Sequence, residues 1–217
     1  MNDVDATPDL PARKKSRAVR RSQLIEATIT TLARRGYART TLTEVARTAG
    51  LSHGLVNFHF DSKERLLAET LAFLADEYRQ TWLADLETAG DDPVAQLDAL
   101  IRADFSAAIC TQSRLSVWCS FWGEAQFRPL YQEKCGSNDD AFIRVREGIC
   151  ARLMRDHGYP GNPALVARVL RNTTEGVWLD LTTTIAPYGL TEGRATVYTC
   201  AAALFPRHFG PQGMLPR

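Results

Sequence analysis

Apolar and polar positions follow helical spacing along most of this chain of 217 residues. In the first segment the apolar side chains form one broad stripe, and Gly36 ends it as a glycine at a helix C-terminus does. The stripe comprises Val19, Leu24, Ile25, Ala27, Thr28, Ile29 and Leu32. The pattern predicts a first helix from near Ser16 to Gly36.

A short second helix is predicted to end at Gly50. Thr41 or Thr43 can cap its N-terminus, because a hydroxyl oxygen accepts a hydrogen bond from a free backbone N–H there. Ser52 can cap a third helix in the same way. Two short helices joined by a tight turn predict a helix-turn-helix unit.

A long helix is predicted over residues 62–88. Asp61 or Ser62 caps it, and its apolar positions 66, 67, 71, 74, 78, 82 and 86 keep helical spacing. A helix of roughly 27 residues spans about 40 Å and is long enough to connect two domains.

Beyond residue 90 the spacing stays helical, and glycine or proline marks the breaks. The predicted helices cover about 94–110, 113–126, 128–157, 163–185 and 191–208. No alternating strand series and no internal repeat is found. The chain is therefore predicted to be all-α, with an N-terminal three-helix helix-turn-helix domain and a C-terminal helical bundle.

The composition sets the expected domain boundaries. Residues 1–12 contain three Asp and two Pro without periodicity, so we expect a disordered tail. The helix-turn-helix domain is predicted over residues 13–61, with the start of the helix 62–88 added to about residue 78. The bundle, over about residues 79–210, is predicted to bind a ligand and to dimerise on grounds given below.

Charge is distributed unevenly, although the net charge is only +1. Residues 13–65 contain twelve Lys or Arg and four acidic residues, a balance of +8. Residues 66–217 contain fourteen basic and eighteen acidic residues, a balance of −4. A basic module joined to a mildly acidic remainder indicates a polyanion-binding domain attached to a second function.

Several classes of protein are disfavoured. No apolar run reaches about 18 residues and the N-terminus lacks the apolar region of a signal peptide, so we expect no membrane span and a cytoplasmic location. Five widely spaced cysteines, Cys110, Cys119, Cys135, Cys150 and Cys200, predict neither a disulfide framework nor a zinc site. No metal site is expected at His53 and His59, since they lie six residues apart on opposed faces of a helix. No cofactor is expected either.

The segment AGLSHGLVNFHF, residues 49–60, divides its side chains between two roles. Val56 and Phe60 are four residues apart and face the core. Leu55 and Phe58 then face outward, where thymine methyl groups in a major groove are one possible partner. Gly54 weakens the helix by about 1 kcal/mol relative to Ala, which indicates a close approach to DNA or to a partner helix.

The longer segment TLTEVARTAGLSHGLVNFHFDSKERLL resembles the helix-turn-helix of the tetracycline-repressor (TetR) family, over about residues 18–78. The matching features are Thr40 and Thr41, the turn Ala46–Leu51 with Ser52, Gly54, His59-Phe60 and Ser62-Lys63-Glu64. The resemblance implies binding to a double-stranded DNA operator.

The resemblance also implies which residues contact DNA. They are Thr41, Thr43, Ser52, His53, Leu55, Asn57, Phe58, His59 and Lys63. The threonines and Lys63 are expected at phosphates, Lys63 as a point charge. The recognition helix, which Ser52 begins, faces the major groove, where Asn57 suits a bidentate contact with adenine. The basic run at residues 13–17 is available for further phosphate or minor-groove contacts.

His59 departs from the family pattern, which most often has a tyrosine at this position to contact phosphate. A histidine can also donate to phosphate, more strongly when it is protonated. The alternative is that His59 packs at the turn. For His53 the alternative is a solvated side chain.

Aromatic residues are concentrated in the C-terminal part. Trp118 and Trp122 share a helix face with Phe121 beside them, and Trp178 lies on a later stripe. The Trp-x-x-Phe-Trp and Glu-Gly-x-Trp patterns resemble the C-terminal domain of the choline-responsive BetI-like branch of the family, over about residues 94–205.

This second resemblance implies a ligand-binding and dimerisation domain, with the homodimer interface on the helices 163–185 and 191–208. The residues expected in a four-helix seam between subunits are Val166, Val169, Leu170, Trp178, Leu181, Ile185, Val197, Ala201 and Leu204.

The resemblance further implies a quaternary ammonium effector, because Trp faces attract such cations and nearby carboxylates add to the attraction. The residues expected around this small-molecule effector are Asp104, Trp118, Phe121, Trp122, Glu124, Glu175 and Trp178. Aromatic residues at helical spacing are more often core, and this alternative stays open for each Trp. A polyamine, an aromatic or an acyl derivative stays open as the effector.

Together these features predict a homodimeric TetR-type transcription factor, a repressor released from a palindromic operator by its effector. An enzyme with an accessory DNA-binding-like head is a second hypothesis, but the sequence has no nucleophile elbow, P-loop or dinucleotide glycine pattern. An architectural DNA-binding protein without effector is a third, and it would lack a ligand cavity.

Overall fold

A computed structural model describes the backbone of residues 12–123 and 128–216 and the side chains of residues 17–123 and 129–216. The chain divides into two compact units, Met1–Thr70 and Leu71–Arg217, each taken by itself below. The expected disordered tail lies outside the described residues except for Ala12, which begins the first helix. In the described ranges, no helix combines the length and apolarity that crossing a membrane requires.

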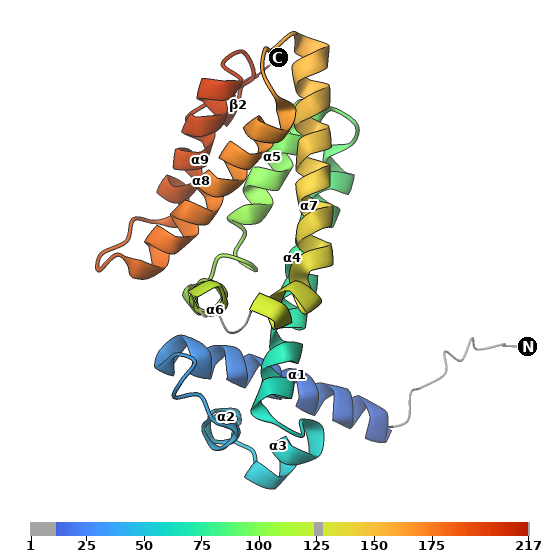
Figure 1. The fold of residues 1–217 in the computed structure, drawn as a ribbon, viewed down its shortest axis with the longest axis vertical. Helices are drawn as coiled ribbons and strands as arrows, with labels where there is room; N and C mark the ends of the chain where they lie inside the picture. Colours follow the sequence, from blue (N-terminus) through green and yellow to red (C-terminus); the bar gives the residue numbers. More distant parts are fainter. Residues whose placement is uncertain (1–11, 124–127, 217) are drawn as a thin grey trace, which may run out of the picture. The chain divides into compact units, whose positions relative to one another are not determined.

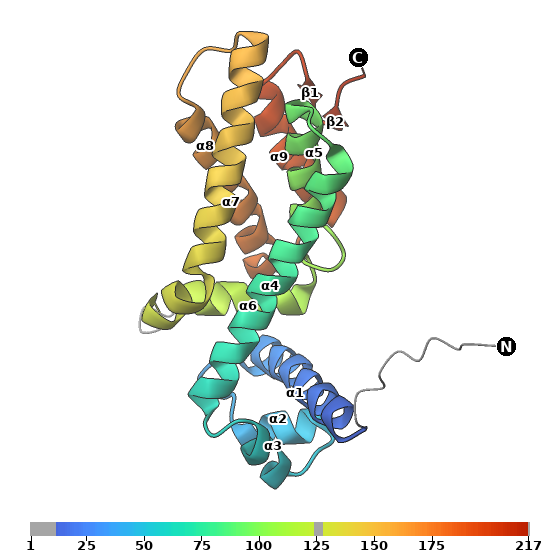
Figure 2. The same ribbon diagram turned by 90° about the vertical axis from the view of Figure 1, so that its right-hand side faces the viewer.

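The first unit contains three helices and the start of a fourth. They are α1 (Ala12–Arg35), α2 (Leu42–Ala49), α3 (His53–His59) and α4 (Lys63–Ala89), which ends in the second unit. In Figures 1 and 2, α2 and α3 are two short helices beside the much longer α1. The predicted three-helix unit is confirmed.

The sequence explains where these helices begin and end. Thr41 and Ser52 cap α2 and α3, since each side-chain oxygen accepts from the backbone N–H three residues later, at 3.2 and 3.3 Å. Gly50 ends α2 with φ of 64°, a left-handed conformation that side chains with a Cβ disfavour. Of the two candidates for capping α4, Ser62 accepts from the N–H of Arg65 at 3.1 Å.

The apolar stripe of α1, except for Val19, which is 62% exposed, forms the core of the first unit with residues of the other helices. Val56 and Phe60, the two residues of the turn segment predicted to be buried, are both 0% exposed. Leu24, Ile29 and Val45 are buried equally well. Because each large apolar side chain contributes about 1.5–3 kcal/mol when fully buried, this core holds the two short helices in place.

The second unit is a bundle formed by the rest of α4 and five further helices. These are α5 (Pro93–Asp104), α6 (Gln112–Gly123), α7 (Arg128–His157), α8 (Pro163–Thr183) and α9 (Leu190–Leu204). Helix α7 packs against α5 and α8, and α8 also packs against α6 and α9 (Figure 2). One continuous core includes Trp82 of α4, Leu100 of α5, Leu153 of α7, Leu170 of α8 and Val197 of α9.

Several predicted helices extend beyond the observed ones. The helix predicted over 94–110 ends at Asp104, and turns follow it. The helix predicted to residue 208 ends at Leu204, because Pro206 disfavours helical backbone at the residue before it. The helix predicted over 113–126 is described to Gly123, and the one predicted to 185 ends at Thr183.

A small hairpin follows α9 and was not predicted. Its strands, β1 (Phe209–Gly210) and β2 (Gly213–Met214), pair antiparallel. Strands of two residues are too short to produce an alternating pattern in the sequence. The all-α fold class is confirmed apart from this hairpin.

Candidate functional site

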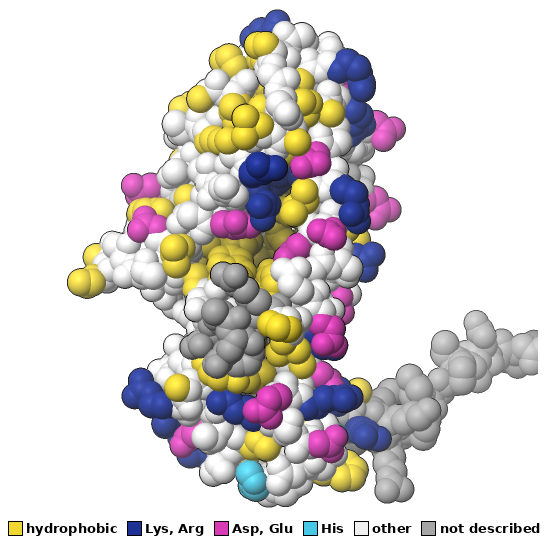
Figure 3. Space-filling view, in the orientation of Figure 1, with side chains coloured by type: hydrophobic (Ala, Val, Ile, Leu, Met, Phe, Trp, Pro, Cys, Tyr) yellow, Lys and Arg dark blue, Asp and Glu magenta, His cyan; other side chains and the backbone are white. Residues whose placement is uncertain are grey.

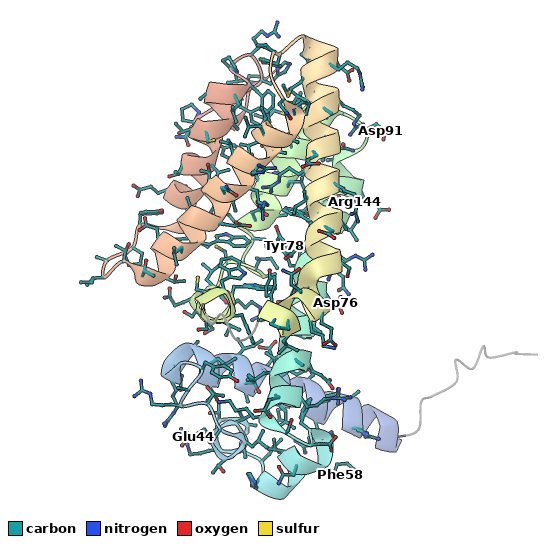
Figure 4. The ribbon with its side chains drawn as sticks, in the orientation of Figure 1. Glu44, Phe58, Asp76, Tyr78, Asp91 and Arg144 are labelled. Atoms are coloured by element: carbon teal, nitrogen blue, oxygen red, sulfur yellow. The ribbon has the colours of Figure 1, made fainter. Side chains whose placement is uncertain are left out.

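The outer side of the helix-turn-helix carries most of the residues expected at DNA. Thr41, Ser52 and Asn57 are exposed. Phe58 of α3, labelled in Figure 4, is 67% exposed. Leu55, which was predicted to face outward, is half-buried. Helix α3 therefore has a buried side at Val56 and a solvent-facing side of polar and aromatic groups.

Thr43 of α2 and His53 of α3 lie next to one another across the turn. Thr43 Oγ1 is 3.4 Å from His53 Nδ1, and both side chains are exposed. The Thr41 cap uses its oxygen as an acceptor, so its O–H remains a donor. The turn thus presents two hydroxyls and an imidazole of the kind that contact phosphates.

Phe58 and Arg17 form a cation–π pair that was not predicted from the sequence. The guanidinium carbon of Arg17 lies 5.7 Å from the centre of the Phe58 ring. An exposed aromatic ring beside a guanidinium combines an apolar face with positive charge. This combination suits contact with the bases and phosphates of a nucleic acid.

His59 is buried, with 9% of its surface exposed, and its Nδ1 atom has no partner among the described residues. Burial, followed by the charges of Arg17 and Arg21, lowers the pKa of His59 below its ordinary value. The imidazole is therefore neutral near neutral pH, and a protonated His59 at a phosphate is disfavoured. Packing at the turn, the alternative for this residue, describes its position.

Lys63 at the start of α4 is half-buried. Its Nζ donates to the Tyr37 carbonyl at 2.9 Å and lies 4.2 Å from the centre of the Tyr37 ring. An ammonium group has three N–H donors, so these contacts leave donors for a phosphate. Tyr37 therefore holds the charge of Lys63 in a defined position without neutralising it.

Part of the basic excess of the first unit is paired with acids. Arg35 and Arg47 contact Glu44 at 3.1 and 2.8 Å, and Arg65 contacts Glu69 at 3.0 Å. These arginines are 42% to 65% exposed, and such surface pairs contribute about 0–1 kcal/mol. They can exchange a carboxylate for a phosphate at little cost.

A cavity of about 330 Å³ lies within the second unit, and its size is typical of small-molecule sites. Residues from α4 to α8 line it, and all belong to this unit. On the face shown in Figure 3, the second unit has a hollow with apolar side chains at its floor and charged side chains around it.

Aromatic rings make up much of the cavity wall. The Trp122 ring stacks with both Trp118 and Trp178, at centroid distances of 6.3 and 6.4 Å. Tyr131 meets Trp118 edge-on at 6.3 Å, and Tyr78 meets Trp178 edge-on at 5.9 Å. Such a group of π faces attracts organic cations. Trp118 and Trp178 also belong to the buried core, so the core and cavity roles coincide in them.

Asp104 lines the cavity, but its carboxylate already has partners. Oδ1 accepts from the Tyr78 hydroxyl at 2.7 Å, and Oδ2 accepts from Arg146 Nη2 at 2.7 Å and from the Thr174 hydroxyl at 3.4 Å. Its backbone carbonyl accepts from Trp178 Nε1 at 3.1 Å. A cation that enters the cavity would have to share the carboxylate with Arg146.

Two further carboxylates face the same cavity. Asp139 accepts from the Tyr131 hydroxyl at 2.9 Å, and Glu175 pairs with Arg171 at 3.0 Å. Burial raises the pKa of both carboxyls above the ordinary range. The described lining holds three carboxylates, with Asp104, against the guanidiniums of Arg146 and Arg171, a formal charge of −1. A cation of charge +1 would balance this cavity.

The structure brings together five of the residues expected around the effector. Asp104, Trp118, Trp122, Glu175 and Trp178 line the same cavity. Two expected residues are not placed there. Phe121 is 4% exposed and is not among the lining residues, and Glu124 lies outside the described residues.

Sequence reasoning missed Tyr78 and the α7 residues Tyr131, Asp139, Phe142 and Arg146, all of which line the cavity. The spacing on α7 did hold a signal, because positions 131, 135, 139, 142 and 146 recur every three or four residues on one face. Polar residues interrupt this stripe, so it does not stand out as an apolar pattern.

The residues expected at a dimer seam fall into two groups. Leu170, Trp178, Leu181, Val197 and Ala201 are at most 5% exposed and fill the core of their own chain, so their assignment to the seam was wrong. Val169 and Ile185 are 40% and 104% exposed, and Val166 and Leu204 are half-buried. Leu165 and Leu179, which the prediction omitted, are 56% and 49% exposed. An apolar surface therefore remains on α8.

Comparison with protein families gives two matches. Residues 24–70 match the family described as bacterial regulatory proteins, tetR family. Residues 93–206 match the family described as BetI-type transcriptional repressor, C-terminal.

Individual relatives are named as regulators of the BetI type. The HTH-type transcriptional regulator BetI of Stenotrophomonas maltophilia is 31% identical over 167 residues, which cover 77% of this chain and 83% of the relative. The HTH-type transcriptional regulator BetI 2 of Chromohalobacter salexigens is 28% identical over 193 residues, which cover 88% of this chain and 91% of the relative.

Solved structures share the fold. A protein of Pseudomonas aeruginosa PAO1 described as a transcriptional regulator has a TM-score of 0.72 at 24% identity, covering 86% of this chain and 90% of that one. One of Saccharomonospora viridis, solved in complex with choline, has a TM-score of 0.73 at 19% identity, covering 88% and 98%.

Proposed function

This chain belongs to the tetR family of bacterial regulatory proteins, with a BetI-type C-terminal domain, and we propose that it represses transcription from a palindromic operator until a small-molecule effector releases it. The observation that carries this proposal is the pairing of a capped helix-turn-helix in one unit with an aromatic-lined cavity in the other. We propose a cytoplasmic location, because a bacterial operator lies on DNA in the cytoplasm.

We propose that α3 is the recognition helix. Asn57 and Phe58 read base edges, and His53 and Leu55 flank them. Thr41, Thr43 and Lys63 hold phosphates. The O–H of Thr41, which its capping contact leaves as a donor, and the position of the Lys63 charge against Tyr37 support this. Ser52 begins the helix and His59 packs behind it.

The proposed operator complex needs a homodimer. Two recognition helices must reach successive major grooves, about 34–36 Å apart, so a symmetric pair of chains reads a palindrome. The exposed apolar residues of α8, Leu165, Val169 and Leu179, support a seam on that helix.

For the effector we propose a quaternary ammonium compound such as choline. Three Trp rings, the formal charge of −1 and the cavity volume of about 330 Å³ all favour a small organic cation. The choline complex of the S. viridis protein with the same fold adds support. The cavity also disfavours the alternative of an architectural DNA-binding protein without effector, since such a protein would lack a ligand cavity. A polyamine carries more positive charge than the lining balances, and an aromatic or acyl effector would leave Asp139 without a cation.

Release of the operator follows from linkage. An effector that binds one conformation of the bundle better than the other shifts the protein toward that conformation. If this conformation binds the operator weakly, the effector lowers operator affinity, and by reciprocity the operator lowers effector affinity by the same factor. A ligand that binds without changing operator affinity would contradict this mechanism.

Choline and 3,3-dimethylbutanol, its uncharged analogue of the same shape, separate the proposals. Choline should raise the melting temperature by mass action, whereas the neutral alcohol should have a much smaller effect at equal concentration. Equal shifts would rule out the cation site. Operator binding is measured independently, with duplexes that the protein enriches from a random library. In these duplexes Asn57→Ala should reduce the preference for one base at one position by about 1–3 kcal/mol.

A further inference from the structure

Helix α4 reaches the cavity through one side chain. Tyr78 is the single α4 residue among the described residues that line it. The same helix begins at Lys63 in the first unit and ends at Ala89 in the second. Among the described residues, a ligand in the cavity can therefore touch α4 directly only at Tyr78.

The hydroxyl of Tyr78 ends in a buried polar network. It donates to Asp104 Oδ1 at 2.7 Å, while Arg146 occupies Oδ2 at 2.7 Å. Asp104 is 0% exposed and Arg146 is 2% exposed, so breaking either hydrogen bond without a replacement leaves a buried polar group unsatisfied. One carboxylate thus joins α4, α5 and α7, and Thr174 adds α8 at 3.4 Å.

Arg146 is the member of this network that a ligand would disturb. A guanidinium has five N–H donors, yet the Nε of Arg146 is buried without a partner among the described residues. The Phe142 ring, 4.5 Å from the guanidinium carbon, supports its charge but accepts no conventional hydrogen bond. A cation in the cavity competes with Arg146 for Asp104, and a ligand oxygen competes with Asp104 for Arg146.

We propose that Tyr78, Asp104 and Arg146 report occupation of the cavity to α4, with Tyr78 as the positioning residue that transmits the change. The inference rests on the proposed function and deepens it. When a ligand displaces Arg146, the carboxylate of Asp104 turns, and the Tyr78 hydroxyl follows its acceptor. Because Tyr78 is fixed to α4, the helix moves with the hydrogen bond, and the ring contacts with Phe142 and Trp178 change with it.

The proposal can be tested without any effector. Asp104→Asn keeps the size of the side chain but offers one carbonyl oxygen where the carboxylate offered two, so Tyr78 and Arg146 compete for it. We expect this substitution to mimic the occupied state and to weaken binding to the enriched operator duplex by about tenfold. In a Tyr78→Phe background there is no hydroxyl to follow the acceptor, and the same substitution should weaken binding by less than about threefold.

Tyr198→Phe is the matched control. Tyr198 of α9 donates to Asp98 of α5 at 2.8 Å, a buried Tyr–Asp bond in the same unit whose residues do not line the cavity. In this background Asp104→Asn should keep its full effect. Thermal melting of each variant shows that the compared proteins are folded. If Asp104→Asn does not fold, Arg146→Lys replaces it, since the lysine keeps the buried charge and loses the fork geometry.

Each outcome has a meaning. If Asp104→Asn lowers operator affinity equally in the wild-type and Tyr78→Phe backgrounds, the inference is overturned. It is also overturned if Tyr198→Phe suppresses the effect of Asp104→Asn as strongly as Tyr78→Phe does. Folded Asp104→Asn and Arg146→Lys proteins that both bind the operator like wild type would also overturn it. A wild-type protein that enriches no duplex would overturn the proposed function and this inference together. Choline chloride without effect on wild-type operator binding would count against the quaternary ammonium effector alone, since the effector-free comparison stands independently.

Discussion

Asp104 of α5 and Arg146 of α7 form an ion pair in which neither side chain is more than 2% exposed, with 2.7 Å between Oδ2 and Nη2. Removing one partner of such a pair leaves an uncompensated buried charge. Asp104→Ala should therefore lower the free energy of unfolding by about 3–5 kcal/mol in urea denaturation.

The double variant Asp104→Leu/Arg146→Met removes both charges and should recover most of this loss, because two apolar side chains of similar volume need no solvation. A double variant as unstable as Asp104→Ala would show that packing, and not the unpaired charge, causes the effect.

Phe60 and Phe58 are two residues apart and should respond in opposite ways. Phe60 is 0% exposed, so Phe60→Ala should destabilise the first unit by about 3–5 kcal/mol. Phe58 is 67% exposed, so Phe58→Ala should change stability by less than about 0.5 kcal/mol and weaken operator binding. Thermal melting and operator titration of the two variants give the comparison, and a Phe58→Ala protein with unchanged operator affinity would remove Phe58 from the recognition surface.

The described residues give Gly54 no packing reason to lack a side chain. A Cβ at this position would meet none of their atoms within 4 Å, and φ is not positive there. Gly54→Ala should therefore stabilise the protein by up to about 1 kcal/mol through helix propensity. If α3 passes close to DNA at this point, the same variant should bind the operator more weakly. Unchanged operator affinity would mean that Gly54 does not approach DNA.

Asp139 and Asp140 are neighbours on α7 with different surroundings. Asp139 lines the cavity, whereas Asp140 is exposed and does not. Asp139→Asn should weaken choline binding by roughly 1 kcal/mol or more, and Asp140→Asn should leave it nearly unchanged. Because burial raises the pKa of Asp139, wild-type affinity for choline should also fall on acidification from neutral pH, and less so in Asp139→Asn. If calorimetric titrations gave the same choline affinity for Asp139→Asn and Asp140→Asn, the cation would not bind beside Asp139.

His59 should make stability depend on pH. Its folded-state pKa lies below the ordinary value of 6.5, so below that pH the unfolded chain binds a proton that the folded chain does not. Its contribution is complete above 6.5 and is lost as pH falls through the folded-state pKa. The melting temperature of wild type should therefore fall more than that of His59→Asn between about pH 7.5 and about pH 5.5.

The difference between the two proteins isolates His59. Burial also lowers the pKa of His208, and the raised pKa values of Asp139 and Glu175 act in the opposite sense, but these groups are common to both. If the melting temperatures of wild type and His59→Asn fall equally over this pH range, the imidazole of His59 is not desolvated.

The local sequence determined the helix-turn-helix almost completely. Thr41, Gly50 and Ser52 set the ends of α2 and α3 through contacts within a few residues, and Val56 with Phe60 defines the buried side. Such interactions depend on spacing alone, which a sequence displays. The family resemblance, confirmed by the matches at residues 24–70 and 93–206, rests on the same local patterns.

Only the tertiary structure decided how charged and aromatic residues far apart in the chain are used. Asp104 was expected to face a ligand, and it is bound by Tyr78 and Arg146, which are 26 and 42 residues away. The stripe of α8 and α9 was expected between subunits, and five of its nine residues fill the chain's own core. Helical spacing states that residues share a face, but it does not state which neighbour that face meets, because the choice depends on how all the helices together bury their apolar surface.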